Sequence, residues 1–591
     1  MKKFLVILLS LLMGVSLFSA CTKTPSEGNK KPGNESSTED PEGDPEGGPE
    51  EEPEEEPEDY WLDSYDSSVK MNLSASGYAK DNIGDFSQYV GTDAYRTVST
   101  ADELIEALLD AKYHYDNVWD EATQSYTQVP QDGYTEDNWE GTVHVIEIVN
   151  DLNLGYKKMS SKALASGIVD NYASKYESLK DYLCWSDMFL ENGISQIKVE
   201  GTSNLLVYSK NGAKITHAGF KLNSDDNVVF RNLEFDEMWQ WEDAPTDQST
   251  KIGDYDWFGW AYFKISFCGF VWIDHCTFGK SYDGQIDYSN PVYDANAGLV
   301  NPPVNRPPFG ANGDNGLHIS WCKFNSGSDD EDGYIYKMME KIEQEYKEGK
   351  QNYLYYNSLR NAGASFDDIL YGLAIPQKKG FLCGDGTNKE KPDYEYNKNL
   401  HISFSNCYFK NLEDRIPKLR GGNAVLYNCV VDSLQYMTYR TKLKSLNAAN
   451  VVASGGGKRN TWKCGLVSQG FVCGCDGSIY AENCIFRGID TLLKNNDGVG
   501  TGGFKMVNCI YQKNASTTEV KGSTTNATNP FPNANGMTTQ AFAWHTEDGE
   551  QPFDITTVDL DDLEEELENS VYGSGTRELD EKFLLRNDYT K

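Results

Sequence analysis

Two acidic and two basic side chains, in segments far apart in the sequence, could serve one reaction. Asp283 and Asp287 lie four residues apart, and on a β-strand residues at that spacing point to the same side. Two carboxylates on one face offer the hard oxygen ligands that suit calcium. Arg415 and Arg420 lie five residues apart, and a planar guanidinium group suits the binding of a carboxylate. The fold has to bring the two segments together.

The segments around these residues resemble the signature of the pectate lyases of polysaccharide lyase family 1. The first reads VWIDHCTFGKSYDGQID from Val271 to Asp287, and the second reads DRIPKLRGG from Asp414 to Gly422. The likeness extends in islands from Tyr78 to Tyr511. Members of this family cut polygalacturonate by β-elimination. The resemblance therefore implies a calcium-dependent pectate lyase that leaves 4,5-unsaturated oligogalacturonates.

The resemblance implies that Asp283 and Asp287 ligate the catalytic calcium. The family usually supplies a further acid from the strand that leads into the VWIDH phrase, and a gap-free comparison places Ala261 there. Asp254 and Asp256 lie just upstream. They could reach the metal, or they could lie in an ordinary exposed loop.

The resemblance also implies roles for the basic residues. Arg415 corresponds to the general base that removes the C5 proton of galacturonate, and Arg420 to an arginine that binds the sugar's carboxylate. Calcium would neutralise that carboxylate and acidify the C5 proton, which makes an arginine base feasible. Lys379, in KKGFLCGD, corresponds to a lysine that binds a substrate carboxylate, and its neighbour Lys378 is the alternative.

Other residues near the first segment suggest chemistry less directly. Asp274 and His275 resemble a catalytic pair, but adjacent strand residues point to opposite faces and cannot both face one substrate. We therefore expect structural roles for them. Four tryptophans flank the sequence GDYDW and could stack on sugar rings or belong to the core: Trp239, Trp241, Trp257 and Trp260.

A short phrase that contains a cysteine recurs along the chain. An aromatic or branched apolar residue follows each cysteine by two positions, and several phrases come after an alternating, strand-like run. A strand phrase that recurs in this way indicates a stacked solenoid. We predict an all-β, right-handed parallel β-helix in which the cysteines are buried free thiols rather than disulfides. The six cysteines are Cys276, Cys322, Cys407, Cys429, Cys484 and Cys509.

Elements outside the repeat have their own signals. Residues 97–111 read as a strand end followed by a capped amphipathic helix, and 143–154 read as the next strand. This opening resembles the N-terminal cap of pectate lyases, which implies that the helix covers the open end of the solenoid. Two insertions interrupt the strands: a Pro/Asn/Gly-rich loop at 288–316 and a segment at 326–376 that is helical around 334–346. Residues 558–569 form a short acidic helix candidate.

The N-terminus predicts export. A charged start, a short apolar run and a small-residue cleavage site make residues 1–20 a signal peptide. The sequence Leu17-Phe18-Ser19-Ala20-Cys21 resembles a bacterial lipobox, which implies a lipid on Cys21 and an anchor in the outer membrane. Residues 21–59 are an acidic, Pro/Glu-rich linker expected to be disordered. We expect the lyase domain over 60–545, and an acidic segment at 546–591 that packs on the solenoid or trails from it.

Charge and motifs limit the alternatives. The formal net charge of −38 argues against nucleic acid and anionic membrane surfaces as partners. We expect a monomer whose partner is polygalacturonate or pectin. A glycosidase on the same scaffold, a non-catalytic glycan-binding protein and a calcium-free pectin lyase remain rivals. The absent acid at Ala261 favours the binding protein, whereas Arg415 and Lys379 oppose it.

Overall fold

The computed structural model describes residues 77–79, 83–120, 125–172, 187–241, 259–290, 315–384, 397–398, 400–446, 466–495, 502–523, 531, 542–546, 548–579 and 581–586. The chain divides into two units, Met1–Glu58 and Asp59–Lys591, and all described residues belong to the second. None of the helices in these ranges is long and apolar enough to cross a membrane. The predicted signal peptide and the lipidation site Cys21 lie outside the described residues.

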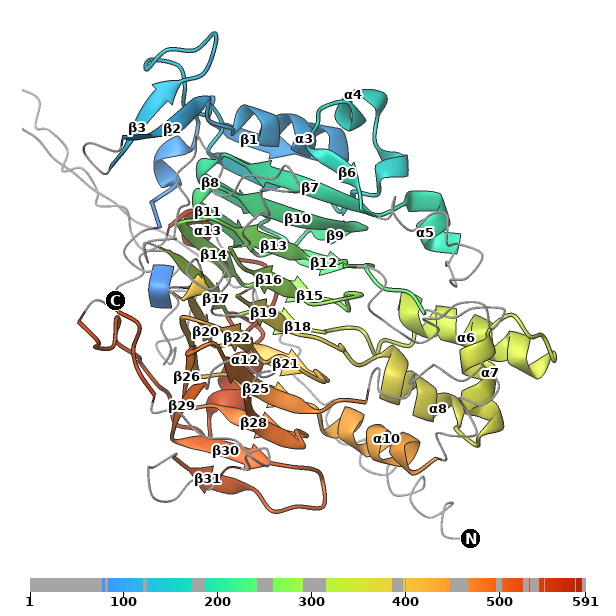
Figure 1. Cartoon of the computed structure of the whole chain (residues 1–591). Coiled ribbons are helices and arrows are strands. Elements are labelled where there is room, and N and C mark those ends of the chain that lie inside the picture. The colour runs from blue at the N-terminus through green and yellow to red at the C-terminus, as the bar shows by residue number, and fades with distance from the viewer. Residues whose placement is uncertain are drawn as a thin grey trace, which may run out of the picture. The chain divides into compact units, whose positions relative to one another are not determined.

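Three long sheets make up the second unit (Figure 1). From β10 to β30 the chain visits the three sheets in rotation, so each coil adds one strand to each sheet. The pairs within the sheets are parallel, apart from the end pairs β6–β7 and β30–β31. The predicted right-handed parallel β-helix is confirmed.

The strands of each sheet follow in chain order. The first sheet holds β1 (Tyr95–Val98), β4 (Val145–Ile148), β8 (Ser203–Tyr208), β11 (Asp226–Arg231), β14 (Phe270–Asp274), β17 (Gly316–Ser320), β20 (His401–Ser405), β23 (Asn423–Tyr427), β26 (Ser478–Glu482) and β29 (Gly503–Val507). The second sheet holds β6 (Val169–Asn171), β7 (Ser195–Glu200), β10 (Ala218–Asn223), β13 (Phe263–Ser266), β16 (Ile286–Tyr288), β19 (Phe381–Cys383), β22 (Lys418–Arg420), β25 (Gln469–Gly474) and β28 (Thr491–Asn495). The third sheet holds β5 (Leu152–Asn153), β9 (Lys214–Thr216), β12 (Glu234–Asp236), β15 (Thr277–Phe278), β18 (Lys323–Phe324), β21 (Tyr408–Lys410), β24 (Val430–Asp432), β27 (Ile485–Arg487), β30 (Cys509–Gln512) and β31 (Val520–Gly522).

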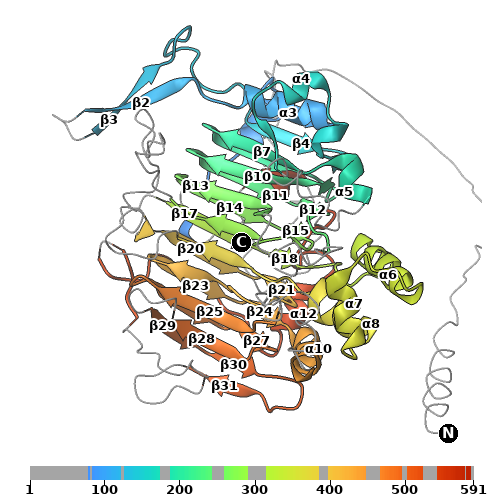
Figure 2. The same ribbon diagram turned by 45° about the vertical axis from the view of Figure 1, so that its right-hand side comes forward.

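Helices lie at the ends and on one side of the coils. In Figure 2, α6, α7, α8 and α10 gather beside the strands of the third sheet. A separate antiparallel hairpin, β2 (Tyr115–Asp120) and β3 (Ser125–Pro130), was not anticipated. The helices are α3 (Ala101–Asp110), α4 (Ser161–Leu164), α5 (Asp187–Asn192), α6 (Tyr334–Lys347), α7 (Leu354–Asn361), α8 (Phe366–Ile369), the π-helix η6 (Leu370–Ala374), α10 (Leu434–Ser445), α12 (Leu563–Glu568) and α13 (Glu581–Leu585).

The predicted N-terminal helix is α3. Thr100 and Glu103 form a reciprocal capping box at its start, which satisfies backbone donors that the first turn leaves without partners. Its buried residues Leu104, Ile105 and Leu108 join the main core. The helix lies at the end of the stack where β1 and β6 are the outermost strands of the first and second sheets (Figure 1).

The recurring cysteine phrase marks the turn between the first and third sheets. The residue before each cysteine has a positive φ, a conformation that asparagine tolerates well. Amide hydrogen bonds of 3.1, 2.9 and 2.8 Å join Asn406, Asn428, Asn483 and Asn508 across successive coils. The described cysteines are all buried and free, as predicted. We call this stack of turns the turn ladder.

The last described residues pack along the turn ladder. The carbonyl oxygens of Thr556 and Val558 accept hydrogen bonds from the amides of Asn428 and Asn483, at 2.9 and 3.0 Å. Further along, the carbonyl of Arg577 accepts one from Asn232 at 2.7 Å. Apolar residues of α12 and α13 also share a buried cluster with the outer faces of the coils.

Candidate active site

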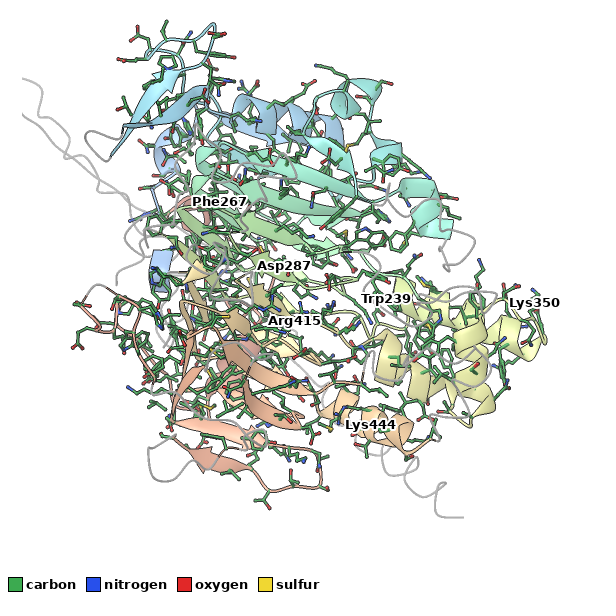
Figure 3. The ribbon with its side chains drawn as sticks, in the orientation of Figure 1. Trp239, Phe267, Asp287, Lys350, Arg415 and Lys444 are labelled. Carbon is green, nitrogen blue, oxygen red and sulfur yellow. The ribbon has the colours of Figure 1, made fainter. Side chains whose placement is uncertain are left out.

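The second sheet brings the predicted site residues together. Asp287 lies on β16 and Arg420 on β22, while Asp283, Lys379 and Arg415 lie in the turns that lead into β16, β19 and β22. These strands are neighbours in the sheet, so the turns stack on successive coils. Figure 3 shows Asp287 and Arg415 midway along the stack, with the level of β19 between them in the sheet order.

Asp283 forms an ion pair with Lys379. The Nζ atom of Lys379 lies 2.5 Å from Oδ1 of Asp283. The side chains are 12% and 22% exposed, respectively, so solvent or a ligand can reach the pair. Of the two candidate lysines, Lys379 is therefore the one that lies beside the predicted calcium acids.

Lys378 lies near a different group of charges. Its positive charge acts on Glu413 and Lys280, both buried. Burial raises the pKa of Glu413 to about 8, against the attraction of Lys280. Burial likewise lowers the pKa of Lys280 to about 7, and its amine lies 4.0 Å from the ring centre of Trp239. Both shifts favour the uncharged forms, so Lys378 lies beside a buried pair and not beside the predicted calcium acids.

Asp287 lacks a partner for one carboxylate oxygen. Its Oδ1 is buried and has no hydrogen-bond partner. Burial raises the pKa of Asp287 to about 6, and the negative charge of Asp283 adds to the shift, while Lys264, Arg415 and Lys379 oppose it. A buried carboxylate oxygen without a donor is costly unless a cation or a ligand satisfies it. This atom therefore indicates a binding site for a cation or a ligand beside Asp283.

The backbone holds Arg415 in an unusual conformation in the turn that leads into β22. Its φ is 65°, and its own N–H donates to the side chain of Asp414 at 2.8 Å. Its carbonyl accepts from the N–H of Phe381 at 2.7 Å. A Cβ on Gly380 would lie 2.5 Å from that carbonyl, so only glycine allows the approach. The Nε of Arg415 is buried without a partner, which leaves a donor for a ligand.

Gln377 connects the three turns. Its side-chain amide donates to the carbonyl oxygens of Asp283 and Lys379, at 2.6 and 2.8 Å. Its side-chain oxygen accepts from the N–H of Ser281 at 2.9 Å. Its backbone carbonyl accepts from the N–H of Glu413, also at 2.9 Å. One fully buried residue thus fixes the relative positions of Asp283, Lys379 and the turn that carries Arg415.

Lys264 is a further basic residue that the motifs did not reveal. It lies on β13 directly opposite Asp287 in the parallel register. Phe263 and Ile265 on either side are buried, so Lys264 points to the outer face that Asp287 shares. The alternation of apolar and polar residues at 263–265 was the only sequence signal for it. Gln377 carried no such signal, because its contacts are made across coils.

Asp274 and His275 correct one expectation. The sequence argument placed them on opposite faces, yet Nδ1 of His275 lies 2.8 Å from Oδ2 of Asp274. The strand ends at Asp274, and His275 turns with a φ of 49°. Both side chains are fully buried, and Arg231 donates to the same carboxylate at 2.7 Å. Their role is structural, as expected, although the geometric reason was wrong.

Several other candidates lie in the core or outside the described residues. Trp239, Trp241 and Trp260 are buried, so they belong to the core and cannot stack on a sugar. Ala261 is buried too. Asp254, Asp256 and Trp257, and almost all of the loop at 288–316, fall outside the described ranges.

Asp283 and Asp287 provide part of a calcium site. The orphaned oxygen of Asp287 and the adjacent carboxylate of Asp283 are hard oxygen ligands, which calcium prefers. In the described ranges, no three His, Cys, Asp or Glu side chains gather around one point. Calcium takes about six to eight oxygens. The two acids therefore fit an ion whose other ligands come from elsewhere, including a bound uronate.

Comparison with known proteins gives a consistent picture. No model of a protein family matches the chain. Pectate lyase B of Paenibacillus amylolyticus is 33% identical over 350 residues, which span 59% of this chain and 76% of that protein. The pectate trisaccharide-lyase of Thermotoga maritima is 23% identical over 295 residues, spanning 47% and 57%. The solved structure of pectate lyase pelN from Paenibacillus sp. 0602 matches 88% of this chain and 99% of its own length, with a TM-score of 0.67 and 26% identity.

The coil architecture and these similarities define a polysaccharide lyase built on a parallel β-helix. The match to pectate lyase B, at 33% identity over 76% of that protein, is sufficient to assign the family. The chain belongs to the pectate lyases of the family 1 type. The resemblance seen in the sequence and the expectation of a lyase are both confirmed.

Proposed function

We propose that the protein is a calcium-dependent pectate lyase that cleaves α-1,4-linked polygalacturonate by β-elimination and releases 4,5-unsaturated oligogalacturonates. One observation carries the proposal: the partnerless Oδ1 of Asp287 lies in the same site as Arg415, whose Nε is also without a partner. The Asp287 oxygen can bind a calcium ion that in turn binds a uronate. The Arg415 nitrogen can donate a hydrogen bond to the uronate itself.

In this reaction each residue has a separate task. Arg415 removes the proton at C5, the C4–O bond breaks, and the electron pair forms the C4=C5 double bond. Arg420 and Lys379 hold substrate carboxylates, which requires Lys379 to leave Asp283. Calcium, held by Asp283 and Asp287, would neutralise the carboxylate next to C5 and so acidify that proton. The leaving sugar oxygen takes a proton from solvent, so no protein nucleophile is needed.

The test is the ultraviolet absorbance of unsaturated product formed from polygalacturonate. We expect activity to disappear in excess chelator and to return with calcium. The double variant Asp283→Asn/Asp287→Asn should need far more calcium than the wild type. Asp329→Asn, which removes an acid paired with Lys410 on the third sheet, serves as the control. Full activity in chelator would contradict calcium dependence.

A pectin lyase is the second candidate. The ion pair of Lys379 with Asp283, and the position of Lys264 opposite Asp287, give both acids a protein cation. Because a lysine offsets the negative charge of each acid, such a site would need no metal ion and would suit a methyl-esterified, uncharged substrate. The same absorbance assay with highly esterified pectin in chelator distinguishes the two, because only a pectin lyase would then be active.

The N-terminus adds a proposal about location. Export as a lipoprotein, with the lipid on Cys21 and anchorage in the outer membrane, would place a monomeric lyase on the cell envelope, where pectin is its partner. The support is the lipobox-like sequence before Cys21 and the acidic linker after it. Cys21→Ser should move the protein from the membrane fraction to the soluble fraction. A variant that stays in the membrane would contradict the anchor.

A further inference from the structure

Lys264 belongs to the active site by position, yet the proposed reaction does not use it. The second sheet has one outward-facing row that runs through Lys221, Lys264, Asp287 and Leu382 in strict register. Within this row, Lys264 is the cross-strand neighbour of Asp287 on one side and Leu382 is its neighbour on the other. Strands in a sheet are about 4.8 Å apart, so Lys264 is the nearest charged strand residue to Asp287 in this row.

The amine of Lys264 lies against Tyr172 and Gly259, and its charge interacts with those of Asp287 and Asp283. The Nζ atom lies 5.4 Å from the ring centre of Tyr172, whose hydroxyl donates to the carbonyl of Gly259 at 2.7 Å. A Cβ on Gly259 would come within 3.4 Å of that Nζ. Burial alone would lower the pKa of Lys264. The attraction of Tyr172, Asp287 and Asp283 outweighs burial, so the pKa lies above its ordinary value. The amine therefore stays charged and lies against the turn at Gly259.

Two amines thus face two carboxylates, but they are held differently. Lys379 extends from a turn and reaches Asp283 by a direct ion pair. Lys264 extends from the middle of β13, and the strand register fixes its place opposite Asp287. A cation that binds both acids can displace the amine of Lys379 from Asp283. At Lys264 the strand register fixes the Cα opposite that of Asp287, and the amine lies between Tyr172 and Gly259. We therefore expect its positive charge to stay in the site beside a bound cation.

We propose that Lys264 is a permanent cation of the active site, which weakens calcium binding at Asp287 and itself binds a carboxylate of the acidic polysaccharide. A uronate carboxylate placed between Lys264 and the metal would relieve the repulsion between them. Metal and substrate would then each strengthen the binding of the other. This inference rests on the proposed function, since it assigns one more contact with the polyuronate.

Calcium binding without substrate tests the proposal that Lys264 weakens the affinity for calcium. Isothermal titration calorimetry of the full chain with calcium alone should show at least about tenfold tighter binding for Lys264→Met than for the wild type, because a neighbouring unit charge is removed. Lys264→Arg, which keeps the charge, should bind calcium as weakly as the wild type. Lys221→Met is the matched control: it occupies the same row one strand away and pairs with Glu200 at 2.8 Å.

Oligogalacturonate binding in chelator tests the proposal that Lys264 binds a carboxylate of the substrate. Lys264→Met should bind trigalacturonate several-fold more weakly than the wild type, and Lys221→Met should not. Lys264→Gln repeats both measurements with a polar side chain, in case the methionine variant does not fold. Calcium affinity that is unchanged in Lys264→Met, calcium binding that is absent from every variant, or unchanged trigalacturonate binding would each overturn the proposal. A wild type that releases no unsaturated product would contradict the proposed function instead.

Discussion

The side-chain amide of Gln377 donates a hydrogen bond of 2.6 Å to the carbonyl oxygen of Asp283, which lies on the preceding coil. The same amide donates to the carbonyl of Lys379, two residues further along its own coil. One buried side chain therefore fixes the spacing between Asp283, a predicted calcium ligand, and Lys379, the lysine paired with it. The site depends on a residue that needs no contact with the substrate.

Gln377→Ala should reduce kcat on polygalacturonate at least about tenfold, because small displacements of positioned groups are costly in catalysis. Its loss also leaves buried carbonyls without donors, which costs about 1–3 kcal/mol each. Asn483→Ala is the matched control, since that buried amide likewise donates across coils but lies in the turn ladder. We expect the control to lower the melting temperature and to keep full activity well below it. Equal losses of kcat in both variants would mean that Gln377 acts only on stability.

Arg415→Lys should lower turnover at least roughly a hundredfold, the low end of what a positioned base contributes. Lysine keeps the charge but shortens the reach and loses the planar fork. Substrate binding should weaken far less, because Arg420 and Lys379 remain. Steady-state kinetics by product absorbance separates kcat from KM, and Arg420→Ala should show the opposite pattern. Near-normal kcat in Arg415→Lys would exclude Arg415 as the base.

Asp287 should make the metal-free protein less stable as the pH rises. Burial, followed by the charge of Asp283, raises its pKa to about 6, above the value of about 3.9 in an unfolded chain. The folded state therefore keeps this proton longer than the unfolded chain does. The stabilisation is complete below about pH 4 and is lost as the pH rises through about 6.

In chelator, Asp287→Asn should therefore raise the free energy of unfolding at pH 7 by on the order of 1–3 kcal/mol, with a much smaller effect at pH 4. Urea unfolding of both proteins at the two pH values measures this. Excess calcium should reduce the advantage of the variant at pH 7, because the ion satisfies the wild-type carboxylate. A difference that does not depend on pH would show that Asp287 already has a partner.

The cysteines of the coils should be reduced in the purified protein. Cys322 illustrates the reason, since its thiol donates to the carbonyl oxygens of Ser320 and Ile273, at 3.2 and 3.6 Å, and stays fully buried. Thiol counting on denatured, unreduced protein should recover all the cysteines that the structure describes. Loss of several thiols to disulfides would refute the stacking of free thiols.

The architecture was predictable because the repeat leaves few choices. Residues such as Cys407 and Cys429 recur at one place in each coil, and strand alternation decides which side faces inward. Once coils stack in register, the turns that carry Asp283, Lys379 and Arg415 fall on successive coils of one sheet, as the motifs also implied. Their roles remain predictions.

The parts that escaped prediction depend on contacts between coils. Lys264 lies opposite Asp287 only because of the register in which β13 pairs with β16. The number of residues between these two strands is not fixed by the repeat, so the register could not be derived from the sequence. Gln377 was missed for the same reason. At His275, the strand ended one residue earlier than alternation assumed, so two neighbouring side chains could meet.

The C-terminal segment contacts late coils with its earlier residues and early coils with its last residues. The residues that reach the turn ladder first during synthesis, Thr556 and Val558, bind the late coils at Asn428 and Asn483. The last ones bind the early coils: the carbonyl of Arg577 meets Asn232, and that of Phe583 meets Arg231 at 2.8 Å. The coils can wind as the chain emerges, but the C-terminal segment reaches the early coils only with its last residues. The first-made turns therefore wait longest for their final partners, and a chain cut short at its end leaves them exposed.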